Sequence, residues 1–177
     1  MLLDPVAAIA LSLLLSYVLV DAGLHKLRDP LRYGAVIDGY RLLPSGLGAR
    51  LALPLGAIEA GLGASLLLPF TREPALAGAA LLIGIYFLGI ALNLARGRRD
   101  IDCGCGAPEQ AQRLSPALLL RNALLVLAAL LLLATPAASP LHWSGWVSAL
   151  FCGAVAALLY ASINTLLANA QMLERLR

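Results

Sequence analysis

The sequence predicts an all-α membrane protein, folded as a bundle of about five transmembrane helices. Of its 177 residues, 60% are hydrophobic and 13% are charged, and the mean hydropathy is +0.85. A soluble domain has about 45–50% apolar and about 25% charged residues. One soluble core of this size cannot bury the apolar surplus, whereas a lipid bilayer can. Apolar stretches of spanning length also recur along the chain, separated by short polar segments.

The thickness of the bilayer sets the length of each predicted span, because about 20 helical residues cross about 30 Å of hydrocarbon. We predict spans at residues 5–26, 47–69, 75–95, 116–134 and 147–167, within a single domain that comprises residues 1–177. Three helix starts pair a capping side chain with proline at the first helical position: Asp4-Pro5, Asp29-Pro30 and Ser115-Pro116.

Residues 29–44 form a predicted amphipathic helix that lies in the membrane interface. This segment is too short and too charged to span the bilayer, and Arg32 and Arg41 lie away from its apolar side. The apolar side chains that can share one side are Leu31, Val36, Ile37, Tyr40 and Leu43. Such a segment is typical of a helix parallel to the membrane plane.

Small residues in two of the predicted spans have a packing role. Gly56, Ala60 and Gly63 form a face in the second span that allows another helix to approach closely. Cys152 stands alone in the fifth span, where we expect it to be a small core side chain.

Basic residues predict the orientation of the bundle. Lysine and arginine gather at residues 26–50, 96–113 and 175–177, while the turns between these segments hold only Arg72. Five spans place the three basic segments on one side, which the positive-inside rule assigns to the cytoplasm. The N-terminus would then lie outside. Arg121, near the start of the fourth span, is expected at headgroup depth. This distribution indicates membrane topology, not a nucleic-acid-binding face.

The most polar segment, Arg96 to Gly106, reads R-G-R-R-D-I-D-C-G-C-G and holds Cys103 and Cys105. A disulfide between them would close a small ring whose Cα separation falls short of the relaxed value. Strained, accessible disulfides tend to be labile or catalytic. We favour thiol–disulfide chemistry, because cysteine is scarce and the loop is otherwise polar. The alternatives are two unpaired thiols and a metal site, although zinc usually takes four Cys or His ligands.

Polar side chains inside predicted spans are costly and mark functional candidates. Tyr17, Asp21 and His25 recur every four residues and share one face of the first span, and Glu59 lies in the second. Together they could form a proton relay or hold a polar headgroup such as a quinone carbonyl. The alternative is a structural cluster that locks two helices together.

Three stretches of the sequence resemble the MauE family of methylamine-utilisation membrane proteins, within the wider DoxX-like group. They read D-A-G-L-H-K-L-R-D-P at residues 21–30, I-E-A-G-L-G at 58–63 and A-L-N-L-A-R-G-R-R-D-I-D-C-G-C-G at 91–106. The resemblance implies a bundle with a four-helix DoxX-like core in the bacterial inner membrane. It also implies that Cys103 and Cys105 are a redox pair, which acts with a thioredoxin-like partner to mature an exported redox protein.

The function we expect is therefore that of a membrane thiol–disulfide redox protein, with a quinone as a further electron carrier. A cytoplasmic cysteine loop would favour the import of reductant, whereas a loop that dips into the bundle would make oxidation plausible. Two alternatives stay open. One is a non-enzymatic assembly factor or subunit of a membrane complex, and the other is a small transporter or metal-handling protein.

Overall fold

The structure, a computed structural model, describes residues 3–44, 46–105, 112–135 and 141–174. In this part of the chain the backbone forms six helices and one isolated β-bridge, between Asp102 and Arg113. The helices are α1 (Pro5–Arg28), α2 (Pro30–Gly39), α3 (Leu47–Ser65), α4 (Arg72–Ala95), α5 (Pro116–Leu133) and α6 (Trp143–Glu174).

The three predicted cap-and-proline starts are confirmed. The Asp4 carboxylate accepts a hydrogen bond from the Val6 amide at 2.8 Å, and Asp29 accepts one from the Arg32 amide at 3.1 Å. Ser115 caps α5 in the same way. Each cap satisfies an amide that has no partner inside its helix.

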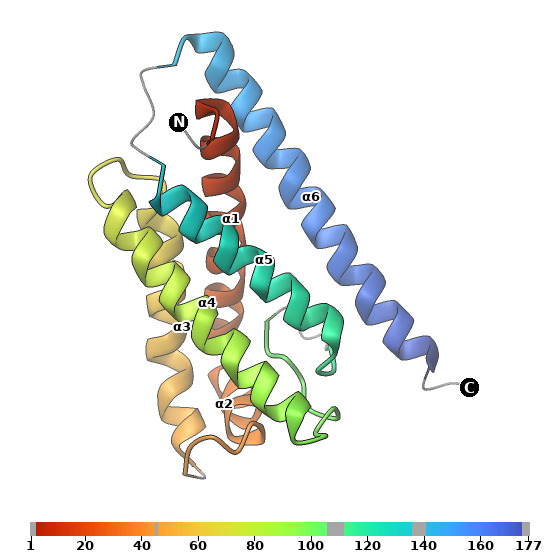
Figure 1. Cartoon of the computed structure of the whole chain (residues 1–177). Coiled ribbons are helices and arrows are strands. Elements are labelled where there is room, and N and C mark those ends of the chain that lie inside the picture. The colour runs from red at the N-terminus through yellow and green to blue at the C-terminus, as the bar shows by residue number, and fades with distance from the viewer. Residues whose placement is uncertain (1–2, 45, 106–111, 136–140, 175–177) are drawn as a thin grey trace.

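The long helices run alternately up and down one bundle, with α1 at its centre (Figure 1). α1 packs on α3 on one side and on α6 on the other, while α4 packs on α5. Their apolar faces form the main core, whose largest fully buried side chains include Leu15, Leu76 and Leu132. α2 lies at one end of the bundle, against α3.

The backbones of α1 and α3 approach each other so closely at Gly23 that no larger side chain fits at that position. A Cβ atom added at Gly23 would lie 2.6 Å from the Ala60 nitrogen and 2.6 Å from the Gly56 oxygen. Nearby, the Ser16 hydroxyl donates a hydrogen bond to the Gly63 carbonyl at 2.7 Å. The small-residue face predicted on the second span is therefore a helix–helix contact, and its partner is α1.

The all-α membrane bundle predicted from the sequence is confirmed. Among the described residues, four helices are long and apolar enough to cross a membrane: α1, α4, α5 and α6. The predicted span 47–69 corresponds to α3, which ends at Ser65 and does not reach that standard. Arg50 and Glu59 reduce its hydropathy, and the fully buried Glu59 faces protein instead of lipid.

The last helix differs most from its predicted span of 147–167, because α6 runs from Trp143 to Glu174. It packs against α1 and leaves much of its surface open. Cys152 is exposed on this open surface as a free thiol, so its prediction as a core residue was wrong. Helical periodicity does not reveal how many neighbours a uniformly apolar helix has.

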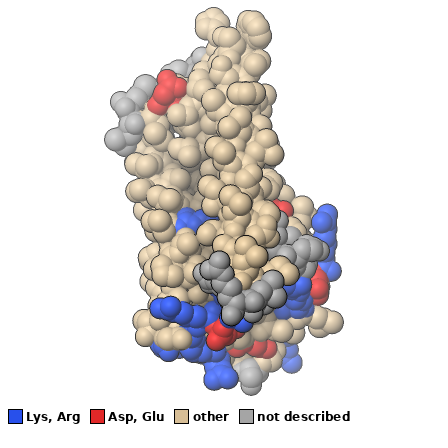
Figure 2. Space-filling view, turned by 90° about the vertical axis from the view of Figure 1, so that its right-hand side faces the viewer, with Lys and Arg blue, Asp and Glu red and all other residues tan. Residues whose placement is uncertain are grey.

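Charged side chains gather at one end of the bundle (Figure 2). This end holds α2, the turn after α4 and the end of α6, while the opposite end is mostly uncharged. The basic segments at 26–50 and 96–113, in their described residues, therefore share one end, as predicted. The basic tail residues Arg175 and Arg177 lie outside the described residues.

The α1–α3 contact yields a stability prediction. Gly23→Ala is expected to lower the free energy of unfolding by about 1–3 kcal/mol, because its methyl group must push two backbones apart. Gly61→Ala is the matched control, since a Cβ at Gly61 meets no atom within 4 Å. The control should be neutral or slightly stabilising. Thermal unfolding in detergent measures both variants, and equal effects would contradict the close approach.

Candidate functional site

The loop between α4 and α5 is built around two short paired arms. The Cys103 amide donates a hydrogen bond to the Gln112 carbonyl at 2.8 Å, and the Leu114 amide donates one to the Ile101 carbonyl at 3.0 Å. Arg113 also pairs with the Asp100 carboxylate at 2.8 Å. The arms are therefore fixed by backbone bonds on both sides of the β-bridge.

Cys103 and Cys105 form a disulfide at the tip of the first arm. Their Cα atoms are 5.3 Å apart, inside the usual range of about 4.4–6.8 Å, so the short Cα separation expected from the sequence is not found. Gly104 makes this turn possible, because its φ is +68° and a Cβ there would lie 2.8 Å from Val36. The Gly104 amide also donates a hydrogen bond to the Asp102 carboxylate at 3.1 Å.

The two sulfur atoms lie in different surroundings. Cys103 is buried and packs with Ile90, Leu114 and Leu118. Cys105 is only half-buried. It lines a small pocket of about 30 Å³ on one side and a larger, more open groove of about 130 Å³ on the other. The pair therefore dips into the end of the bundle, and Cys105 is the less buried of its two residues.

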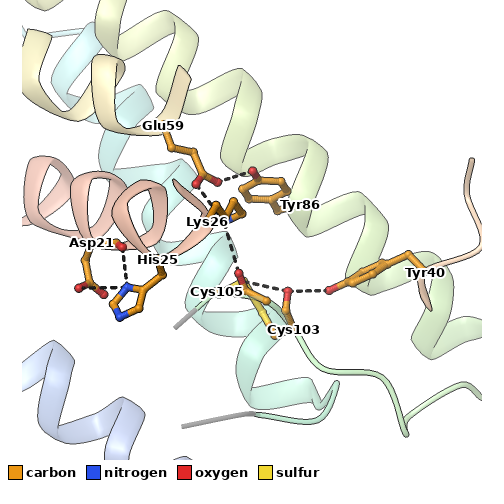
Figure 3. A network of polar contacts seen from close by, with 9 residues as sticks. Asp21, His25, Lys26, Tyr40, Glu59, Tyr86, Cys103 and Cys105 are labelled. Carbon is orange, nitrogen blue, oxygen red and sulfur yellow. Dashed lines mark hydrogen bonds and ion pairs between the residues drawn. A yellow bond between two sulfur atoms is a disulfide. The ribbon is translucent and has the colours of Figure 1, made fainter. Parts of the chain in front are cut away.

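A buried ion pair lies next to the cysteine turn (Figure 3). The Lys26 ammonium lies 2.9 Å from the Glu59 carboxylate, and both side chains are buried. The Tyr86 hydroxyl donates a short hydrogen bond to the other Glu59 oxygen. Lys26 also donates to the Gly104 carbonyl at 3.3 Å. One lysine thus connects α1, α3 and α4 to the cysteine turn.

Only part of the predicted polar set comes together. The His25 ring nitrogen Nδ1 lies 3.5 Å from the Asp21 carboxylate and 2.7 Å from the Asp21 carbonyl. Tyr17 makes an edge-to-face contact with Tyr160 from α6, with the ring centres 6.5 Å apart. Glu59 contacts neither group. It pairs instead with Lys26 of α1 and Tyr86 of α4 (Figure 3).

Sequence reasoning missed Lys26, which it counted among the basic loop residues. The missed signal was Glu59 itself, because a carboxylate inside a span requires a buried cation. Lys26 is the only lysine of the chain and ends the predicted first span. Tyr86 gave no comparable signal, since a tyrosine in a span is equally typical of the membrane interface.

Arg121 was also missed as a site residue, since its side chain reaches the disulfide. Its Nη2 is 3.7 Å from the Cys103 sulfur, and its Nη1 donates to the Asn164 side chain at 2.9 Å. The guanidinium also lies over the Tyr160 ring, 5.8 Å from its centre. A positive charge at this distance stabilises a thiolate, so Cys103 has a cation to pair with when the disulfide opens.

Two further contacts hold the loop against α2. The Tyr40 hydroxyl donates a hydrogen bond to the Cys103 carbonyl at 3.1 Å. Arg98 donates to the carbonyls of Gly39 and Tyr40 and to the Asn93 side chain. Burial raises the pKa of Tyr40 above its ordinary value, and the Asp102 carboxylate adds to this shift. Tyr40 therefore keeps the proton that it donates at every physiological pH.

Positive charge surrounds the cysteine turn. Two cations flank it, Arg121 at the Cys103 sulfur and Lys26 at the Gly104 carbonyl. Cations near a disulfide favour the thiolates that its cleavage produces.

These features define a helical, multi-pass membrane protein with a cysteine pair at the charged end of its bundle. The family model described as methylamine utilisation protein MauE matches residues 4–135. The match covers α1 to α5 and the cysteine loop, and the chain belongs to the MauE family.

Similarity to individual relatives extends over most of the chain. Three of them, each named methylamine utilization protein MauE, come from different bacteria. The one from Paracoccus denitrificans is 34% identical over 93% of this chain and 89% of its own. The one from Paracoccus versutus is 38% identical over 92% and 88%, and the one from Methylorubrum extorquens is 40% identical over 79% and 77%. No solved structure matches the chain.

The buried ion pair yields a second prediction. Lys26→Met is expected to cost about 3–5 kcal/mol of unfolding free energy, because it leaves the Glu59 carboxylate buried without a cation. Adding Glu59→Gln should recover most of this loss, since it removes the orphaned charge. Thermal unfolding of the single and double variants in detergent measures the coupling.

Asp21→Asn is the control for this cycle, since the Asp21 side chain on the same helix is 41% exposed. Its effect is expected to stay within about 1 kcal/mol. Additive losses at Lys26 and Glu59 would show that the two charges do not depend on each other.

Proposed function

We propose that this protein is a membrane thiol–disulfide redox protein whose Cys103–Cys105 pair exchanges electrons with a thioredoxin-like partner. The main support is the asymmetric setting of the pair: one sulfur is half-exposed, and the other is buried beside a cation. A disulfide in this setting has one sulfur open to attack and one thiolate stabilised as the leaving group.

The exchange proceeds through a mixed disulfide. A partner thiolate attacks the Cys105 sulfur, the Cys103–Cys105 bond breaks, and Cys103 leaves as a thiolate beside the Arg121 guanidinium. The second thiol of the partner then attacks the mixed disulfide, which releases Cys105 and closes the partner's own disulfide. Two electrons pass from the partner to the pair, and the same steps in reverse oxidise the partner.

The biological role follows from the family. The relatives are named for methylamine utilisation, and this protein would serve the same process by maturing an exported, disulfide-containing redox protein. The bundle would lie in the bacterial inner membrane with its N-terminus outside. The charged end, which holds the cysteine pair, would face the cytoplasm.

A second function, that of a non-enzymatic assembly factor, also has support in the site. Cys103 packs into an apolar cluster, and Lys26 and Tyr40 bind the backbone of the cysteine turn. The same contacts are expected if the disulfide serves only to hold the loop in place. Replacement of both cysteines by serine with full function retained would favour this alternative.

Thiol trapping tests whether the pair cycles. In a Cys152→Ser background, a mass-tagging maleimide is expected to add two tags only after treatment with reductant, because the two sulfurs are otherwise bonded. Two tags without reductant under oxidising conditions would contradict the proposal. The same tagging with a membrane-impermeant maleimide, in intact cells and in inverted vesicles, reports which side the pair faces.

The asymmetry of the pair predicts which cysteine the partner captures. Cys103→Ser leaves the half-exposed Cys105, and this variant should hold a mixed disulfide with a thioredoxin-like protein about tenfold more than Cys105→Ser does. Non-reducing electrophoresis with mass spectrometry measures the two yields. Equal yields, or a higher yield at Cys103, would contradict the assignment of Cys105 as the attacked sulfur.

A further inference from the structure

An open groove, which we call the lateral groove, runs from the surface of the bundle to the disulfide. It lies between α4 and the segment that follows α2, and its volume of about 130 Å³ is well above the roughly 10–15 Å³ that a cavity needs to hold one water. The residues that the argument uses are Leu42, Leu43 and Ile85 at its entrance and Lys26, Tyr86 and Cys105 at its inner end.

The outer part of the lateral groove is apolar and open on a membrane-facing side. Leu42 is 42% exposed, Leu43 is 45% exposed and Ile85 is 54% exposed. Ile85 lies in the middle of α4, a helix long and apolar enough to span a membrane. A ligand that enters past Ile85 therefore comes from the hydrocarbon layer, which selects a lipid-soluble molecule.

The inner part is polar and reaches the reactive sulfur. Cys105 lines it together with the Lys26 ammonium and the Tyr86 hydroxyl, which share Glu59 as their partner. The Tyr86 hydroxyl donates its one proton to Glu59, whereas the Lys26 ammonium has three N–H donors, of which Glu59 and Gly104 take two. The third donor of Lys26 suits a carbonyl oxygen. A lipid tail would leave this donor without a partner, and a charged phosphate headgroup would not suit the leucine-lined entrance.

We propose that the lateral groove binds the ring of a lipid-soluble quinone, which takes up the electrons of the reduced cysteine pair. This inference rests on the proposed function, because it needs a pair that opens and closes. This groove differs from the quinone site predicted at Tyr17, Asp21, His25 and Glu59, since none of these residues lines it. Glu59 acts behind it, through Lys26 and Tyr86.

The reaction balances as a two-electron transfer. The thiols of Cys103 and Cys105 lose two protons and two electrons and form the sulfur–sulfur bond. The quinone gains the two electrons and two protons and becomes a hydroquinone. Lys26 is the group placed to pass these protons to a carbonyl oxygen, because the only proton of the Tyr86 hydroxyl is donated to the Glu59 carboxylate. The electrons of the cysteine pair thus pass to a quinone dissolved in the lipid. The quinone oxidises the pair, and no water-soluble oxidant is needed.

The test uses the reduced full-length protein with Cys152→Ser in lipid nanodiscs, and decylubiquinone as the probe. The pair is expected to close on addition of the quinone, measured by the loss of two maleimide tags and by the absorbance of the hydroquinone. Gly89→Ile fills the groove, because a Cβ at Gly89 already lies 3.6 Å from Leu42 and Tyr40. It should slow closure about tenfold relative to closure by diamide, a water-soluble oxidant.

Gly84→Ile is the matched control on the same helix, since Gly84 does not line the groove and a Cβ there meets no atom within 4 Å. It should close at the rate of the parent protein. Equal slowing in both glycine variants, or no closure by quinone while diamide still closes the pair, would overturn the inference and leave the proposed function standing. Failure to close with either oxidant would instead refute the proposed function.

A binding measurement completes the test. In a Cys103→Ser, Cys152→Ser variant, decylubiquinone is expected to slow the reaction of Cys105 with N-ethylmaleimide several-fold, because its ring covers the sulfur. Decanol, which supplies a tail of the same length without the ring, should not protect. Equal protection by decanol would show that the groove holds lipid tails, and would overturn the inference.

Discussion

The ion pair between Lys26 and Glu59 is the interaction on which the rest of the site depends. Both side chains are buried, and each is held by a second group, Gly104 in one case and Tyr86 in the other. A buried pair adds little net stability, but the loss of one partner is costly. The pair therefore fixes how α1, α3 and α4 align, and it binds the cysteine turn to that alignment.

This pairing requires that α1 and α3 lie unusually close together, and the glycines provide that closeness. Gly23 lies one turn before Lys26, and Gly56 lies one turn before Glu59, with backbone atoms in the space that side chains would occupy. Because the backbones approach closely, a short glutamate side chain can reach the lysine directly. The same two helices that carry the charges thus carry the residues that bring those charges together.

Sequence patterns predicted the parts of this structure that depend on local interactions. Asp4 and Ser115 mark helix starts because a cap needs only its own first turn, and the apolar stretches mark spans because the bilayer has one thickness. The contacts of Lys26 with Glu59 and of Arg121 with Cys103 join residues far apart in the sequence. In the sequence, Lys26 and Arg121 resemble ordinary basic residues near a loop, because a charge pattern does not show which way a side chain points.

The paired arms of the cysteine loop affect what happens when the disulfide opens. The bonds from Cys103 to Gln112 and from Leu114 to Ile101 are backbone contacts that do not involve sulfur. Cutting the sulfur–sulfur bond would therefore remove none of these contacts, and the frame of the loop would not depend on the oxidation state of its cysteines. Opening and closing of the disulfide would then need little movement of the backbone.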